Sequence, residues 1–307
     1  MIRPFETHSF KDRTVRDLWW VLTGADLLAA ECCPIVPAMD RSELSSQLAP
    51  LEADPAPLHE FVAGSVARQP FRLGAYFEDL VGFYVAVVLG HRVERGLPIR
   101  VAGRTLGELD LLFEAAGTRH HWELAVKFYL FLPGLEPEPG ESFVGPQVRD
   151  RLHRKVARLR DHQVPLPGRD EASECLTTWL PLQSAALVRG RLFYPAQTDW
   201  RARQPVVDLS PGHECGWWCH VEALRDALPD ASGYAWLERF QWLAPIDARI
   251  DPVEVFDRDG LIRSADAMGA EWPDDHPRSH VMVGLDADGM EVHRGFVVST
   301  GWPGEFL

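Results

Sequence analysis

Two acidic residues and one lysine in the middle of the chain have the types and spacing of a cation-binding site. Asp110 lies in the apolar run Leu106–Phe113, and Glu123 lies in a second apolar run, His121–Leu130. Lys127 follows Glu123 by four residues, so the alternation of a β-strand puts both side chains on one face. Paired carboxylates supply the oxygen ligands that hard cations such as Mg²⁺ prefer.

The two apolar runs are predicted to form a β-hairpin with its turn near residues 117–118. If the turn contains two or four residues, Glu114 faces Arg119, and Asp110 then faces Glu123. Opposite Cβ atoms in a hairpin lie about 4.5–5.5 Å apart, so two carboxylates in these positions repel each other. A loop of three or five residues would break this register. With the even turn, we expect Mg²⁺ or Mn²⁺ between Asp110 and Glu123.

Two predicted helices flank the hairpin in sequence. Arg72–Gly90 has a wide apolar stripe, and Glu78 falls among its apolar residues, where a carboxylate is costly unless it is paired or reaches water. Gln147–His162 is expected to pack through an apolar stripe formed by Val148, Leu152, Val156 and Leu159. Its other faces carry the densest basic cluster of the chain, with Arg149, Arg154, Lys155 and Arg158 as candidate phosphate contacts. A solvated helix face is the alternative interpretation.

The remaining segments give an alternation of helices and strands. Thr14–Leu28 is expected to be a helix, and Ser42–Pro57 a surface connection. His91–Val101 is expected to be a strand, and Ser184–Phe193 a strand or a tight hairpin. Tyr234–Leu243 is expected to be a short aromatic helix. His280–Leu285 and Met290–Val298 are expected to form a second hairpin.

Composition places the chain among ordinary globular proteins. It has 307 residues, 46% hydrophobic content and a net charge of −14. The acidic balance disfavours non-specific binding of nucleic acid, although a local basic patch remains compatible with it. The polar N-terminus has no apolar core like that of a signal peptide, and the longest apolar run is too short for a membrane helix. Together with five irregularly placed cysteines, this predicts a cytoplasmic protein without a membrane partner.

The acidic and lysine pattern resembles the PD-(D/E)XK nuclease superfamily over about residues 70–195. The wider sequence resembles a bacterial family known only as domain of unknown function 1853, through the segments Leu73–Leu80, Thr105–Phe113, Glu123–Leu130 and Arg294–Val298. The nuclease resemblance implies a restriction-endonuclease-like α/β fold with a mixed sheet, and the predicted order helix, strand, strand, strand, helix, strand matches that core. It also implies that Glu78 can complete the metal site. The superfamily pattern places its lysine where this chain has Ala125, two positions before Lys127.

These observations divide the chain into three expected regions. They are a helical N-terminal segment (1–69), the nuclease-like core (70–195) and a β-rich accessory region (196–307). The leading hypothesis is a metal-dependent nuclease, a hydrolase in which Asp110 and Glu123 hold the metal ion. Glu78 would assist, and Lys127 would orient or activate the attacking water.

Two other hypotheses about function remain open. Ala125 and the net charge of −14 favour a catalytically inactive nuclease-like domain that binds nucleic acid or a protein. Cys215 and Cys219, flanked by histidines, form a weaker candidate zinc site.

Overall fold

The computed structural model describes residues 10–68, 72–134, 141–202, 206–272 and 277–304. Across these residues the chain is a mixed α/β protein with one nine-stranded sheet, in which the strand order is β1-β2-β3-β5-β6-β9-β8-β7 and β4 pairs with β3. The strands are β1 (Val93–Val101), β2 (Arg104–Ala115), β3 (Thr118–Phe131), β4 (Phe143–Val144), β5 (Gln183–Pro195), β6 (Glu214–His220), β7 (Gly233–Leu237), β8 (Ser279–Leu285) and β9 (Glu291–Val298).

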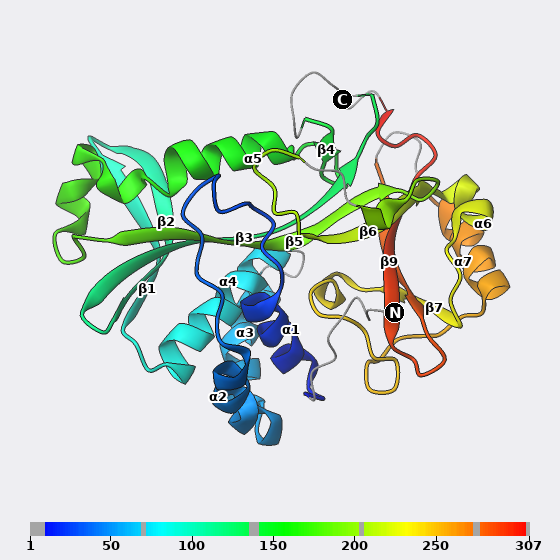
Figure 1. Ribbon diagram of the computed structural model, residues 1–307, viewed down its shortest axis with the longest axis horizontal. Coiled ribbons are helices and arrows are strands. Elements are labelled where there is room, and N and C mark those ends of the chain that lie inside the picture. Colours follow the sequence, from blue (N-terminus) through cyan, green and yellow to red (C-terminus); the bar gives the residue numbers. More distant parts are fainter. Residues whose placement is uncertain (1–9, 69–71, 135–140, 203–205, 273–276, 305–307) are drawn as a thin grey trace.

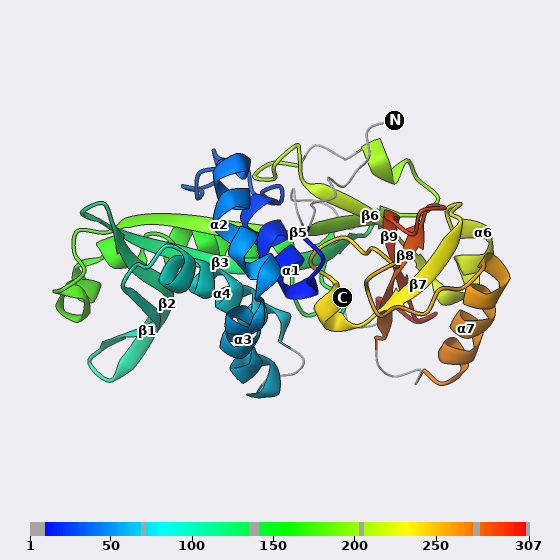
Figure 2. The ribbon, with the colours of Figure 1, turned by 90° about the horizontal axis from the view of Figure 1, so that it is seen from below.

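Helices lie on both faces of this sheet. The α-helices are α1 (Arg13–Thr23), α2 (Arg41–Ala53), α3 (Ala56–Arg68), α4 (Leu73–Phe83), α5 (Leu152–Arg158), α6 (Leu224–Ala227) and α7 (Arg258–Ala270). Single π-helical turns extend α4 over Tyr84–Val88 and α5 over Leu159–Gln163. Short 3₁₀ turns cover Leu166–Gly168, Asp170–Leu176, Trp200–Ala202, Val221–Ala223 and Arg239–Gln241. Figure 1 shows α5 on one side of β2, β3 and β5 and α1 to α4 on the other, and Figure 2 shows the same helical layer from below.

The predicted hairpin and its register are confirmed. Strands β2 and β3 are antiparallel, with Glu114 opposite Arg119 and Leu111 opposite Trp122. The turn is Ala116-Gly117, with φ values of 50° and 77°. A two-residue hairpin turn of the mirror-image type needs positive φ at both positions, and it keeps the count of residues even. The register inferred from the sequence is therefore the one that the turn imposes.

The C-terminal strands extend the same sheet. Strands β3, β5, β6 and β9 run parallel to one another, and β8 and β7 follow as antiparallel neighbours. The predicted second hairpin is confirmed as β8 and β9. The alternative of a tight hairpin within Ser184–Phe193 is wrong, because β5 runs straight through this segment and Gly190 adopts φ 150° without a turn.

Three other expected elements differ in the structure. Ser42–Pro57 is not a surface connection, because Asp40 caps α2 and Leu44, Leu48 and Leu51 bury one helical stripe.

The basic helix begins at Leu152 rather than Gln147. Val148 has φ 67°, and the amide of Gly145 bonds the carbonyl of Asp150, so these residues form a turn. The expected packing is nevertheless confirmed, since the side chains of Val148, Leu152, Val156 and Leu159 are all buried.

The expected helix Tyr234–Leu243 is instead β7 followed by a 3₁₀ turn. Its first residues pair with β8, and aromatic residues such as Tyr234 and Trp236 suit a strand packed on both sides.

The main hydrophobic core joins the two ends of the described chain. One cluster of buried side chains includes Phe10 and Leu18 from the N-terminal segment, Leu111 from β2, and Phe296 and Trp302 from the C-terminal region. No helix in the described parts of the chain is long and apolar enough to cross a membrane.

Candidate functional site

Asp110 and Glu123 are neighbours where β2 and β3 part. Main-chain pairing between these strands runs from Ala115 to Leu111, and Asp110 is the next residue along β2. Its Oδ2 atom accepts a hydrogen bond from the amide of Leu124 at 2.8 Å, so a side chain takes the place of a main-chain partner. The two carboxyl groups lie close enough to hydrogen-bond each other. The predicted proximity of Asp110 and Glu123 is confirmed.

Burial and mutual repulsion keep these carboxyl groups partly protonated near neutral pH. Burial raises the pKa of Asp110 to about 7, and the charge of Glu123 adds to this. Burial also raises the pKa of Glu123 to about 7, although Lys155 and the hydrogen bond with Asp110 act in the opposite direction. Two such groups cannot both ionise cheaply unless a cation lies beside them.

Glu78 belongs to the same electrostatic cluster. It comes from α4, which lies on the face of the sheet opposite α5 (Figure 1). Burial raises its pKa to about 7, and the next largest cause is the charge of Asp110. The side chain is half-buried and borders a cleft. The structure therefore brings Glu78 near the pair that the sequence analysis singled out.

Neighbouring side chains hold Glu123 in one orientation. Gln163 Nε2 donates to Glu123 Oε2 at 2.6 Å, and His121 Nε2 lies 3.0 Å from Glu123 Oε1. Burial lowers the pKa of His121 to about 4, so its imidazole is neutral at pH 7. Its other nitrogen, Nδ1, lies 3.1 Å from Ser184 Oγ. A neutral ring can satisfy both contacts if Nε2 carries the proton and Nδ1 accepts from the hydroxyl of Ser184.

None of these supporting residues was predicted from the sequence. His121 precedes Glu123 by two residues, so strand alternation alone could have placed both on one face. Gln163 lies 40 residues beyond Glu123 in the chain, and Ser184 is on β5. Their contacts depend on how α5 and β5 pack against β3, which no local pattern shows.

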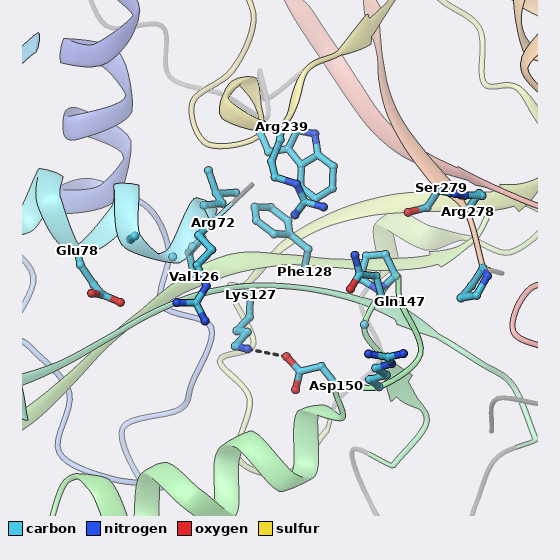
Figure 3. Close-up of a pocket in the computed structure, with 18 of the residues that line it drawn as sticks. Arg72, Glu78, Val126, Lys127, Phe128, Gln147, Asp150, Arg239, Arg278 and Ser279 are labelled. Carbon is cyan, nitrogen blue, oxygen red and sulfur yellow. Dashed lines mark hydrogen bonds and ion pairs between the residues drawn. The ribbon is translucent and has the colours of Figure 1, made fainter. Parts of the chain in front are cut away.

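The two lysines have different surroundings. Lys127 Nζ donates to Asp150 Oδ2 at 2.5 Å inside the cleft, where Figure 3 shows the pair. Lys155 Nζ instead donates to Gln163 Oε1 at 2.9 Å. Burial lowers the pKa of Lys155, nearby Lys127 lowers it further, and the charges of Glu123 and Asp110 raise it. Lys155 thus shares an electrostatic environment with the carboxylate pair.

The four residues predicted to contact phosphates have different surroundings. Arg149 is exposed in the turn before α5 and lines the cleft. Arg154 and Arg158 are exposed on α5 itself, and Lys155 is turned toward Gln163. Ala125 stands where the resembled superfamily has its lysine. Its side chain is buried in the same apolar cluster as Leu152 and Val156 of α5.

The cleft beside Glu78 has a volume of about 840 Å³. In Figure 3, Glu78 lies toward one end and Arg278 toward the other, with Lys127 and Arg239 between them. Its charged lining residues are Arg72, Lys127, Arg149, Arg239, Arg278, Glu78, Glu108 and Asp150. Cations outnumber anions here, although the whole chain carries a net charge of −14.

Within the described residues, no three side chains of His, Cys, Asp or Glu are grouped closely enough to hold a metal ion. The donor set that is present is the pair Asp110 and Glu123, with Glu78 farther away. Such a pair fits Mg²⁺, which keeps several waters and usually takes only one or two protein carboxylates.

The candidate zinc residues on β6 have other surroundings. Burial raises the pKa of the Cys219 thiol to about 12, so it carries its proton at neutral pH. The flanking His213 lies 2.9 Å from the hydroxyl of Tyr194, and His220 lies 2.7 Å from the carbonyl of Trp302. These contacts account for both histidines as structural groups.

Comparison with known proteins identifies a family for nearly the whole chain. The model of a family described as domain of unknown function (DUF1853) matches residues 16–298, and the chain therefore belongs to this family. No curated protein matches the chain, and no solved structure matches it. The resemblance to PD-(D/E)XK nucleases gains no support from these comparisons and depends on the residues alone.

Proposed function

We propose that this member of the DUF1853 family is a metal-dependent nuclease. The observation that carries the proposal is the pair of neighbouring carboxyl groups, half-buried Asp110 and fully buried Glu123, at the point where two strands part. Glu123 has no exposed side-chain surface, and burying two acidic groups side by side is costly unless a cation compensates. Perturbed acidic groups of this kind are concentrated at functional sites.

In this proposal Asp110 and Glu123 hold one Mg²⁺ or Mn²⁺. Bound there, the ion would polarise a phosphate oxygen and lower the pKa of a bound water. Gln163 and His121 keep the Glu123 carboxylate oriented toward Asp110, as supporting residues do in metal sites. Glu78 lies on the cleft side of the pair. There it assists the metal site directly or through a bound water.

A lysine near the pair can orient or deprotonate water. Lys127 was expected in this role, and Lys155 is a second candidate because its pKa is lowered by burial and by Lys127. A lysine is a better base when burial lowers its pKa toward the working pH. Substituting each lysine in turn separates the two candidates experimentally.

The order of elements gives independent support. From α4 onward the chain runs helix, strand, strand, strand, helix, strand, through α4, β1, β2, β3, α5 and β5, apart from the two-residue β4 and short helical turns. This order agrees with the core of the resembled nuclease superfamily. Fold alone does not determine activity, so the metal site carries the functional argument.

The test is cleavage of single- and double-stranded DNA and RNA with Mg²⁺ or Mn²⁺, together with calorimetric titration of the metal. Asp110→Asn should abolish metal binding and reduce cleavage by more than the roughly 10–100-fold typical of outer-shell changes. The metal-free variant should be as stable as the parent or slightly more stable, because one of two repelling charges is gone. Asp288→Asn, an exposed change in the β8–β9 turn, is the matched control.

A second candidate function is a catalytically inactive domain that binds nucleic acid or a protein. The specific observation in its favour is Ala125, which is buried where the resembled pattern has a lysine. Under this alternative the parent protein shows no cleavage of any of the four substrates and no calorimetric metal binding. That combined result would refute the nuclease proposal.

A further inference from the structure

A π-helical turn at the end of α5 brings Gln163 into line with Lys155. Lys155 is in α5, and Gln163 ends the π turn, in which the amide of Val164 bonds the carbonyl of Leu159. Residues eight apart in a regular α-helix differ in direction by about 80°. The extra residue of one π turn reduces this difference to about 20°, so the two side chains lie on one stripe of the helix. Their contact therefore depends on the irregular turn, a feature that is frequent at functional sites.

The side-chain amide of Gln163 links a cation to an anion. Its Oε1 atom accepts a hydrogen bond from Lys155 Nζ at 2.9 Å, and its Nε2 atom donates to Glu123 Oε2 at 2.6 Å. The reverse orientation of the amide would set two donors against each other at Lys155 and two acceptors against each other at Glu123. The groups at both ends therefore fix the direction of this amide.

Gln163 anchors an ammonium group that has no carboxylate partner. Among the described residues, Lys155 forms no ion pair, and Gln163 is its one hydrogen-bond partner. The charges of Glu123 and Asp110 nevertheless act on Lys155, so its ammonium lies within electrostatic reach of both. A lysine has a flexible four-carbon stem, and a buried carboxylate attracts an ammonium strongly. A direct ion pair is the arrangement that these charges favour, and the Gln163 amide takes its place.

The same arrangement leaves Glu123 able to bind a cation. An ionised carboxylate has about four positions at which its oxygens can accept a hydrogen bond or bind a metal ion. His121 and Gln163 each take one of these positions. Neither contact brings a formal charge, because the His121 ring is neutral at pH 7. A directly bound ammonium would instead neutralise the carboxylate that a metal ion needs.

We propose that Gln163 is a positioning residue that holds Lys155 beside Glu123 and prevents a direct ion pair between them, so that the carboxylate stays open to the metal ion. This inference rests on the proposed function, because it concerns the metal site of the proposed nuclease. It gives Gln163 a second role besides orienting Glu123. Without the amide, Lys155 moves to Glu123 and competes with the metal ion for the carboxylate.

The test is calorimetric titration of the full chain with Mn²⁺, combined with substitutions of both residues. Gln163→Leu removes the amide at nearly constant volume and should weaken Mn²⁺ binding by roughly tenfold or more. Lys155→Met should change the affinity of the parent by no more than about twofold. Added to Gln163→Leu, the same change should strengthen Mn²⁺ binding by about fivefold or more, because it removes the competing ammonium.

Two controls separate competition from other effects. Arg154→Met removes the same charge from an exposed position of α5, and in the Gln163→Leu background it should change Mn²⁺ affinity by no more than about twofold. Gln183→Leu makes the same substitution at an exposed position of β5 and should keep Mn²⁺ binding within about twofold of the parent. Urea denaturation checks that each variant folds, and Gln163→Ala replaces Gln163→Leu if leucine is not tolerated.

A crystal structure of the metal-free Gln163→Leu variant gives a readout that needs neither metal nor activity. Lys155 Nζ should lie within about 4 Å of a Glu123 carboxylate oxygen, the range of an ion pair. The inference is overturned if Lys155 stays away from Glu123 in that structure. It is also overturned if Lys155→Met gives no gain in the Gln163→Leu background, since Gln163 would then only orient Glu123. A parent that binds no Mn²⁺ refutes the proposed function instead, and the crystal structure alone then tests whether Gln163 separates Lys155 from Glu123.

Discussion

Glu123 is the most constrained side chain of the candidate site. It is fully buried, and it is held by His121 and Gln163 while Asp110 lies beside it. A carboxyl group that only filled space would be replaced at lower cost by an apolar residue. The supporting contacts therefore favour a role that needs a carboxylate with a fixed direction.

Substitutions of the two lysines test which of them acts on water at this site. Lys155→Met should lower turnover roughly a hundredfold, because Lys155 shares an electrostatic environment with Glu123 and Asp110. Lys127→Met should cost less than about tenfold, since Lys127 is already engaged by Asp150. Neither change should weaken metal binding, because each removes a positive charge near the site.

The measurement is single-turnover cleavage combined with metal titration, with both variants made to the same residue. A larger loss for Lys127→Met than for Lys155→Met would restore Lys127 as the lysine that acts on water. A loss of metal affinity in either variant would show that the substitution had disrupted the metal site itself. The loss of turnover could then not be assigned to the lysine's action on water.

At the scale of elements, the hairpin was predictable and the neighbours that complete the site were not. The register of β2 and β3 follows from strand alternation and a two-residue turn, so Asp110 could be placed beside Glu123 by counting. The start of α5 could not be found in this way, because Val148 adopts φ 67°, a conformation that a β-branched residue rarely takes. Tertiary contacts hold that turn in place, and they also decide that Lys155 faces the carboxylates.

Strand β5 gives a sharp test of how the sheet supports the site. Gly190 lies opposite Lys127 in the parallel pairing of β3 and β5, and its φ is 150°. A Cβ atom added there would lie 1.7 Å from the carbonyl oxygen of Lys127, so the two strands would have to separate. We expect Gly190→Ala to lower the free energy of unfolding by about 2–4 kcal/mol.

Urea denaturation measures this difference, and Gly168→Ala is the matched control. A Cβ atom at Gly168 would meet nothing within 4 Å, so that variant should remain within about 0.5 kcal/mol of the parent. Equal stability of the two variants would mean that β3 and β5 are not held as closely as the structure has them.

For the whole molecule, the sequence predicted the α/β class but not the continuity of the sheet. The boundary expected between residues 195 and 196 falls between β5 and β6, which are hydrogen-bonded neighbours. The hydrophobic core also spans this boundary, and the N-terminal Asp17 accepts a hydrogen bond from the amide of Ala244. Such long-range pairings leave no local signal, because each strand pattern is compatible with several neighbours.

The region after residue 195 also supplies part of the cleft. Arg239, Trp242 and Arg278 line it, whereas the acidic groups Glu78, Asp110 and Glu123 all come from the preceding region. Arg191 of β5 and Arg294 of β9 both donate to the carbonyl of Trp242. The wall of the cleft is therefore built on the junction between the two expected regions.

We expect the full chain to unfold in one cooperative transition, and residues 70–195 not to fold when expressed alone. The fragment would keep the three acidic groups, but it would lose the strand that covers the edge of β5 and much of the shared core. An uncovered edge strand next to exposed apolar surface promotes aggregation. Calorimetry of the full chain and circular dichroism of the fragment measure both outcomes. Two separated heat-absorption peaks, or a fragment with a cooperative melt, would show that the nuclease-like core is independent of the C-terminal strands, and the cleft would then be an interface between two folding units.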